Sequence, residues 1–120
     1  MRVLLWITTV ALVATSEAFA APHGGGNYDG RWSVEVITDQ GTCDRVYRWM
    51  LGIQGGRVVD IGEVARPSGG ISPNGAVSIR FVRNRDYATA TGRLSGDWGS
   101  GSWSSPTLAC SGRWRAERRG

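Results

Sequence analysis

Apolar and polar positions alternate with a period of two along much of this chain. Between residues 31 and 38, Trp32, Val34 and Val36 alternate with charged and polar side chains, and residues 77–81 repeat the pattern. A period of two places the apolar side chains on one face of a β-strand. Apolar residues nowhere recur at spacings of three and four over a helix-length window, so the pattern predicts an all-β chain.

Turn residues separate the alternating stretches. Gly55-Gly56 is typical of a two-residue hairpin, because both positions of the tight primed turn require positive φ. The segment 66–70, Arg-Pro-Ser-Gly-Gly, is expected to be a loop. The strands expected between the turns are 31–38, 43–54, 57–64, 77–81, 87–94, 98–104 and 110–118.

The expected strand 43–54 is apolar on both faces. Tyr47, Trp49, Leu51 and Ile53 fall on one face with Cys43 and Arg45, while Val46, Arg48 and Met50 fall on the other. Such a strand is either covered on both sides or interrupted by a bulge.

Seven or eight short antiparallel strands in a meander favour closure into a small barrel. Closure removes the unpaired strand edges that an open meander would leave. It would also bring together the two ends of the domain, near Trp32 and Trp114. A two-sheet sandwich is the alternative.

The first residues have the pattern of an export signal. Arg2 precedes the apolar run 3–13, and Ala18-Phe19-Ala20 provides a small-residue cleavage site. We therefore expect a signal peptide over 1–20, a flexible lead-in over 21–27 and a single domain over 28–120. The mature chain would be periplasmic or secreted, with no transmembrane segment.

Cys43 and Cys110 form an even pair in a chain expected to be exported, which predicts a disulfide. Closing a loop of this length contributes on the order of 4 kcal/mol to stability. A catalytic thiol or a metal site lacks partners, because the chain's only histidine is His23, outside the expected domain. No metal ligands are predicted.

The chain is basic, with a formal net charge of +4, and all fourteen of its basic side chains are arginine. Export makes anionic envelope glycans, lipid head groups or an acidic protein more plausible partners than nucleic acid. A solvated, mildly basic surface is the alternative. The arginines cluster at Arg80, Arg83 and Arg85 and at Arg113, Arg115, Arg118 and Arg119.

The sequence Gly-x-Trp occurs three times, ending at Trp32, Trp103 and Trp114. A glycine two positions before a tryptophan lies on the same strand face and leaves space for a neighbouring ring. These tryptophans could fill the core. Trp98 and Trp103 are five positions apart, so on a regular strand they face opposite sides, and either could stack on a flat ligand. The expected ligand-binding residues are Trp98, Trp103, Arg80 and Tyr87.

The Gly-x-Trp on the first strand, followed by a meander with glycine-rich turns, resembles the small barrels of lipocalins and avidins. The ending, from Gly92-Arg93-Leu94-Ser95-Gly96 through Gly101-Ser102-Trp103 to the segment 110–118, is similar to a group of small exported proteins of alphaproteobacteria. Some members of that group have names linking them to haem utilisation or adhesion. The resemblances imply a small ligand-binding or adhesive barrel.

No pair of carboxylates shares a rigid face, and Ser and Thr residues lack a base to activate them, so no catalytic residue is predicted. The expected function is a non-enzymatic binding module for an anionic or flat ligand: a glycan, a small hydrophobe or a haem-like molecule. The alternatives are a structural protein or inhibitor acting on another envelope protein, and a hydrolase with unrecognised carboxylates. No cofactor is expected. Haem is the alternative, with Tyr28, Tyr47, Tyr87 or Met50 as axial ligand. The oligomeric state stays open.

Overall fold

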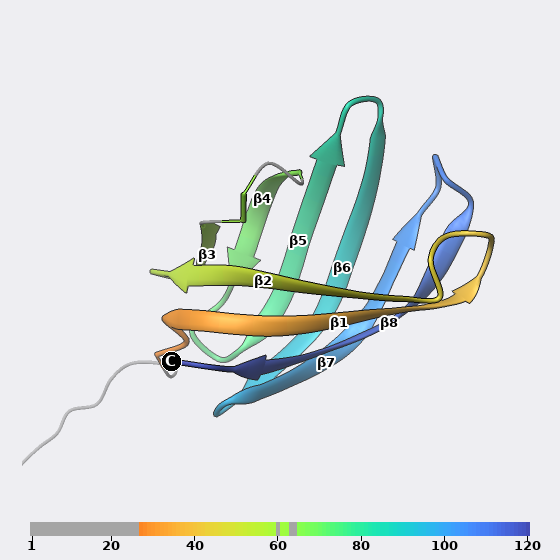
Figure 1. Cartoon of the computed structure of the whole chain (residues 1–120). Helices are drawn as coiled ribbons and strands as arrows, with labels where there is room; N and C mark the ends of the chain where they lie inside the picture. The colour runs from red at the N-terminus through yellow and green to blue at the C-terminus, as the bar shows by residue number, and fades with distance from the viewer. Residues whose placement is uncertain (1–26, 60, 63–64) are drawn as a thin grey trace, which may run out of the picture.

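The protein is an antiparallel β-barrel (Figure 1). The computed structural model describes residues 27–59, 61–62 and 65–120, and the expected signal peptide and His23 lie outside this part. Within these ranges all regular structure is β, and no helix there is long and apolar enough to cross a bilayer. The strands are β1 (Gly30–Gln40), β2 (Val46–Gln54), β3 (Arg57–Val59), β4 (Arg66–Ile71), β5 (Ala76–Arg83), β6 (Asp86–Ser95), β7 (Trp98–Ser105) and β8 (Cys110–Arg118).

The strand order in the sheet is β3-β2-β1-β8-β7-β6-β5-β4. The strands form a meander in which the first strand of the chain, β1, pairs with the last strand, β8. β1 pairs with β8 from Trp32, opposite Arg118, to Gln40, opposite Ser111, with a register shift after Thr38. The seam therefore lies between β3 and β4, where the Ile71 amide donates a 2.8 Å hydrogen bond to the Gly56 carbonyl. The predicted barrel is confirmed, and its closure joins the two ends of the domain as expected.

The prediction of a loop over 66–70 is wrong, because these residues belong to strand β4. Pro67 lies opposite Phe81 of β5. A proline lacks the N–H that a central strand needs, but β4 is at the edge of the sheet and requires ladder bonds on one side only. Its glycines and proline conceal the alternation that a strand normally shows.

The other expected strands agree with the structure to within a few residues, apart from two shortened ones. β3 begins at Arg57 as expected and ends at Val59, and residues 60, 63 and 64 of the expected strand 57–64 lie outside the described residues. Cys43 lies in the loop before β2 and not in the strand, which begins at Val46. Gly55 and Gly56 have φ of 60° and 80°, as the primed hairpin turn requires.

The inward residues of β2 are those of the Tyr47 face. Leu51 and Ile53 are buried, whereas Val46 and Met50 on the opposite face are exposed. β2 is therefore covered on one face only, and Val46 and Met50 are exposed on the outer surface of the barrel.

One glycine of the Gly-x-Trp recurrence, Gly101, makes room for a tryptophan of the neighbouring strand, and Gly92 of β6 does the same. A Cβ on Gly101 would lie 2.7 Å from the indole nitrogen of Trp114, and a Cβ on Gly92 would lie 2.7 Å from the Cζ2 atom of the same ring. Both glycines thus make room for a ring from β8 that crosses β7 toward β6. The Trp114 N–H donates to the Thr91 carbonyl at 3.0 Å.

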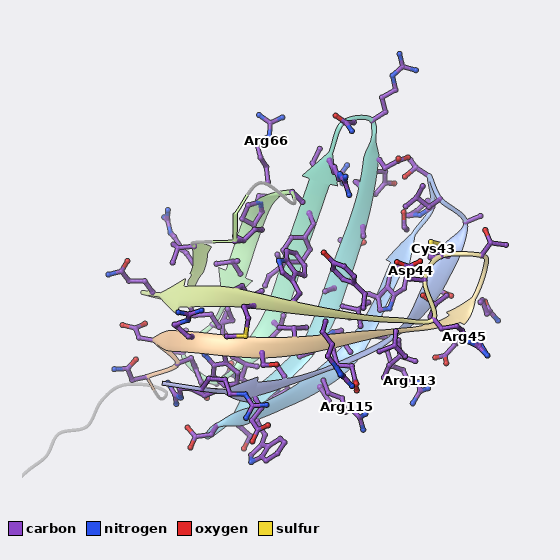
Figure 2. All side chains as sticks on the ribbon, in the orientation of Figure 1. Cys43, Asp44, Arg45, Arg66, Arg113 and Arg115 are labelled. Carbon is purple, nitrogen blue, oxygen red and sulfur yellow. A yellow bond between two sulfur atoms is a disulfide. The ribbon has the colours of Figure 1, made fainter. Side chains whose placement is uncertain are left out.

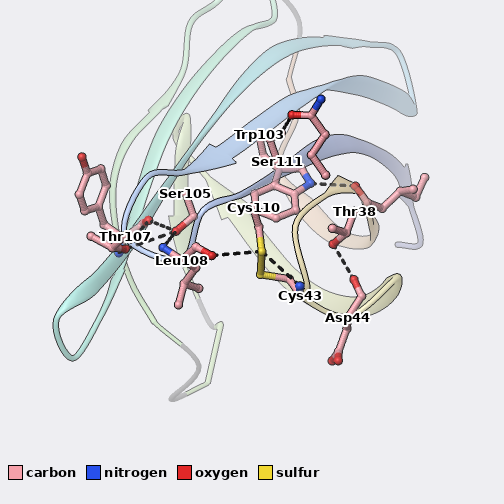
Figure 3. Close-up of a disulfide and its surroundings, with 12 residues drawn as sticks. Thr38, Cys43, Asp44, Trp103, Ser105, Thr107, Leu108, Cys110 and Ser111 are labelled. Atoms are coloured by element: carbon pink, nitrogen blue, oxygen red, sulfur yellow. Dashed lines mark hydrogen bonds between the residues drawn. A yellow bond between two sulfur atoms is a disulfide. The ribbon is translucent and has the colours of Figure 1, made fainter.

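The predicted disulfide is present. Cys43 lies in the β1–β2 loop (Figure 2) and is bonded to Cys110 at the start of β8, with the Cα atoms 6.2 Å apart. The Cys43 amide also donates to the Cys110 sulfur at 3.2 Å (Figure 3). The bridge therefore ties the β1–β2 loop to the β8 strand with which β1 closes the barrel.

Candidate functional site

The interior of the barrel contains a cavity of about 560 Å³. Small-molecule sites usually have volumes of about 300–1,000 Å³, so the cavity has the size of a binding site. Its wall is predominantly apolar and is formed by inward residues of every strand. The main contributors are Trp32, Val34, Val36, Trp49, Leu51, Ile53, Val58, Ile71, Val77, Ile79, Phe81, Ala88, Ala90, Leu94, Trp103, Trp114 and Ala116.

The interior is not filled because strand β6 presents small side chains to it. Ala88 and Ala90 are opposite Phe81 and Ile79 of β5 and therefore point inward. Gly92 follows on the same face, but its space is taken by the Trp114 ring. The space above Ala88 and Ala90 has no such occupant among the described residues and belongs to the cavity.

The cavity reaches the barrel end formed by the β1–β2, β5–β6 and β7–β8 turns. Its lining there is more polar and includes Cys43, Arg83, Asn84, Asp86 and Ser105. The side chain of Ser105 donates a 2.6 Å hydrogen bond to the Tyr87 carbonyl, which fixes the β7–β8 turn against β6 (Figure 3). This end is therefore the polar mouth of an apolar cavity.

Trp32 occupies the opposite end. It is fully buried, and its N–H donates to the Tyr28 carbonyl at 2.9 Å. The guanidinium carbon of Arg118 lies 5.1 Å from the centre of its ring, within cation–π range. A ligand would therefore enter through the polar mouth.

One wall of the cavity carries an aromatic cluster. The Trp49 ring lies 5.1 Å from Phe81 and 6.3 Å from Tyr47, centroid to centroid, both at tilted angles. The indole N–H of Trp49 is buried and has no hydrogen-bond partner among the described residues. Trp49 is thus held by ring packing, whereas the N–H of Trp103 donates to the Ile37 carbonyl at 3.0 Å.

The four residues expected to bind ligand do not form one site. Trp103 lines the cavity, and Tyr87 borders it at the mouth, but the Tyr87 ring lies on the outer face beside Arg80. Trp98 is 61% exposed on the outer face, so the two tryptophans of β7 face opposite sides as predicted. Arg80 is exposed on the outer side of β5, with its guanidinium carbon 3.9 Å from the centre of the Tyr87 ring.

Sequence reasoning missed most of the cavity wall, including Trp49, Phe81 and Ala90. Alternation indicated which face of each strand is apolar, but an apolar face predicts a filled core as readily as an empty one. The available signal was the small residues of β6 at alternate positions, Ala88, Ala90 and Gly92, beside strands with large apolar residues.

The outer face of β1 carries a carboxylate between two guanidiniums. Glu35 lies opposite Arg48 of β2 and Arg115 of β8 and forms ion pairs with both, at 2.7 Å to Arg48. At the register shift, Asp39 accepts two hydrogen bonds from Arg113, at 2.8 and 2.9 Å. The hydrogen bonds from Arg115 and Arg48 lower the pKa of Glu35, and those from Arg113 lower the pKa of Asp39.

Acid should weaken the barrel through these carboxylates. A group with a lowered folded-state pKa stabilises the fold above its unfolded pKa, and this stabilisation is lost as the pH falls through the folded-state pKa. For Glu35 the loss therefore begins near the ordinary value of 4.5 and continues below it. We expect carboxyl NMR shifts of Glu35 to titrate below 4.5, with the midpoint moving up in Arg115→Ala. An unchanged midpoint in that variant would contradict the pairing.

Both outer carboxylates are thus paired with arginines on neighbouring strands. Among the described residues, no three His, Cys, Asp or Glu side chains gather as a metal site. Of the residues considered as haem ligands, Met50 lies on the outer face and Tyr28 accepts the Trp32 hydrogen bond at the closed end. Tyr47 lines the cavity, whereas the Tyr87 ring lies on the outer face beside Arg80.

No protein-family model matches this chain, and no curated protein matches it either. The cavity and the chemistry of the outer wall are therefore the observations that bear on its function.

Proposed function

We propose that this protein is a non-enzymatic binding protein of an extracytoplasmic compartment that holds a small, largely apolar ligand inside its barrel. The observation that carries the proposal is the apolar cavity of about 560 Å³ with a polar mouth. Ligand sites combine an apolar lining with a few polar groups that orient the ligand, which is the distribution found here.

The aromatic cluster favours a flat ligand. Tilted rings of Trp49 and Phe81 line the wall, and Trp103 is held in place by its hydrogen bond to Ile37. Aromatic faces provide large contact areas at low cost in conformational entropy. A planar hydrophobe would therefore gain contact on its faces, and any polar substituent would lie toward Arg83 and Asn84 at the mouth.

The lining supports binding more than catalysis. Asp86 is the one carboxylate among the described lining residues, so the second carboxylate of an acid–base pair is not among them. The disulfide is compatible with an oxidising compartment outside the cytoplasm, as the expected signal peptide also implies. Release from the cell and retention in the periplasm fit this proposal equally.

The test is binding of N-phenyl-1-naphthylamine, a neutral, flat dye that fluoresces in apolar surroundings. The wild-type protein should bind one dye per chain. Ala90→Phe places a ring in the cavity and should weaken binding by about tenfold or more, since buried volume is lost to the ligand. Ala88→Phe, nearer the mouth, should do the same.

Thr91→Phe is the matched control, because Thr91 adjoins Ala90 in sequence but is exposed on the outer face. It should change affinity less than about twofold. Circular dichroism would establish that each variant is folded. If folded Ala90→Phe and Ala88→Phe bind the dye as the wild type does, or if the wild type binds no dye, the proposal is wrong.

A further inference from the structure

The outer face of the barrel has a groove in addition to the interior cavity. It lies over β6, β7 and β8, has a volume of about 420 Å³, and is lined by Arg93, Ser95, Trp98, Gly99, Ser100 and Arg115. We call these six residues the outer groove. Because Trp98, Ser100 and their neighbours point away from the barrel interior, this groove is separate from the cavity.

Trp98 is not part of the hydrophobic core formed by the described residues. Its side chain is 61% exposed, and it is the one exposed large apolar residue in the groove. Its neighbours across the sheet are Ser95 of β6 and Glu117 of β8, which do not cover an indole ring. An exposed indole beside small side chains presents a flat apolar face to whatever enters the groove.

Two guanidiniums flank the groove in the row next to Trp98. Arg93 of β6 and Arg115 of β8 lie on either side of Ser100 of β7, one strand away in each direction. Neighbouring strands are about 4.8 Å apart, so the two arginines start about 10 Å from one another and can reach over the serine between them. Figure 2 shows Arg115 projecting from the outer side of the barrel, close to Arg113.

Within the described part of the chain, neither arginine has all of its N–H donors paired. Arg93 donates one hydrogen bond, to the Asn74 carbonyl. Arg115 shares Glu35 with Arg48, and its side chain is 68% exposed. A guanidinium has five N–H donors and binds carboxylates or phosphates in bidentate fashion. The groove therefore combines spare donors for an acidic group with a flat apolar face.

We propose that the outer groove binds an acidic glycan, with a sugar ring stacked on Trp98 and its acidic groups bound by Arg93 and Arg115. A pyranose has an apolar face of C–H groups and hydroxyls at its rim, which match the indole and the hydroxyls of Ser95 and Ser100. A bilayer surface fits less well, because membrane-binding faces present several apolar side chains to the lipid, and this groove has one.

The experiment measures binding of three uronate oligosaccharides, from polygalacturonate, alginate and hyaluronan, to the oxidised protein by calorimetry. A neutral cellulose oligomer of similar length is the ligand control. We expect at least one uronate oligomer to bind, with affinity falling as salt increases. Trp98→Ala should weaken that binding about tenfold, and Arg93→Ala and Arg115→Ala should each have a comparable effect.

Arg66→Ala is the matched protein control. It removes the same charge from an exposed position on β4, which does not line the groove, and should leave affinity within about twofold. Equal losses in Arg66→Ala and Arg93→Ala would mean attraction to net charge only and would overturn the site. So would binding of none of the three oligomers, or binding of anionic lipid vesicles in their place.

The two sites are separable. Trp98→Ala should leave dye binding in the cavity unchanged, and Ala90→Phe should leave glycan binding unchanged, because the two side chains lie on opposite faces of the sheet. Failure of the outer groove would therefore leave the cavity proposal standing, and the reverse also holds.

Discussion

Replacing both cysteines with alanine is expected to lower the free energy of unfolding by about 4 kcal/mol. Cys43 and Cys110 are 67 positions apart, so the bond removes a large amount of loop-closure entropy from the unfolded chain. For a domain of about 100 residues this loss corresponds to a decrease in melting temperature of roughly 15–30 °C.

The location of the bond adds to this effect. The β1–β8 pairing closes the barrel, and it shifts register after Thr38, close to the β1–β2 loop that holds Cys43. Without the bond, this end of the ladder is secured by weaker contacts, such as the hydrogen bond from the Thr38 hydroxyl to the Asp44 carbonyl. Opening is therefore expected to begin at the mouth.

The measurement is urea unfolding of the double alanine variant beside the oxidised and the reduced wild type. Alanine avoids placing a hydroxyl at Cys110, which is only 4% exposed. The reduced wild type should resemble the variant, because both lack the same constraint. A double variant within about 1 kcal/mol of the oxidised protein would show that the sheet alone fixes the barrel.

The sequence predicted the barrel because its strands are half-buried and bounded by strong turns. Trp32 and Trp114 were expected near the ends that closure joins, and they lie in strands β1 and β8, which pair directly. Strand β4 was missed for the opposite reason. An edge strand paired on one side can contain Pro67 and two glycines, and such a segment has no alternation to read.

The candidate sites were predictable only in part. The five-residue spacing predicted that Trp98 and Trp103 face opposite sides, because a strand alternates faces regardless of its neighbours. Which of the two is outside came from the structure, where Trp98 is exposed and Trp103 lines the cavity. The volume of the cavity depends on the sizes of the inward side chains of all eight strands together, once the barrel is closed. Neither the emptiness above Ala90 nor the alignment of Arg93, Ser100 and Arg115 can be obtained before the register of the strands is known.

Trp32→Ala should cost about 3–5 kcal/mol of stability, the range for removing a large aromatic side chain from a core. Trp32 is completely buried between its neighbours Leu51 and Arg118 on the adjoining strands. Small domains are stable by about 5–15 kcal/mol in total, so this variant should be near the limit of folding.

The surroundings of Trp32 show why little relaxation is expected. Gly30 leaves room for Arg118, whose Cδ atom would lie 3.2 Å from a Cβ at that position. Arg118 is in turn held by Asp97 at 2.9 Å and by the Asp29 carbonyl at 2.6 Å. Because these hydrogen bonds hold the Arg118 guanidinium in place, the Arg118 side chain cannot move into the space that the indole of Trp32 leaves. The Trp32→Ala substitution should therefore leave a cavity.

Trp98→Ala is the matched comparison, since it removes the same side chain from a 61% exposed position. Its free energy of unfolding should stay within about 0.5 kcal/mol of the wild type. Chemical denaturation of both variants, followed by circular dichroism, measures the contrast. Similar losses in the two would mean that Trp32 does not seal the barrel, and the closed end would then have to be fixed by the β1–β8 ladder alone.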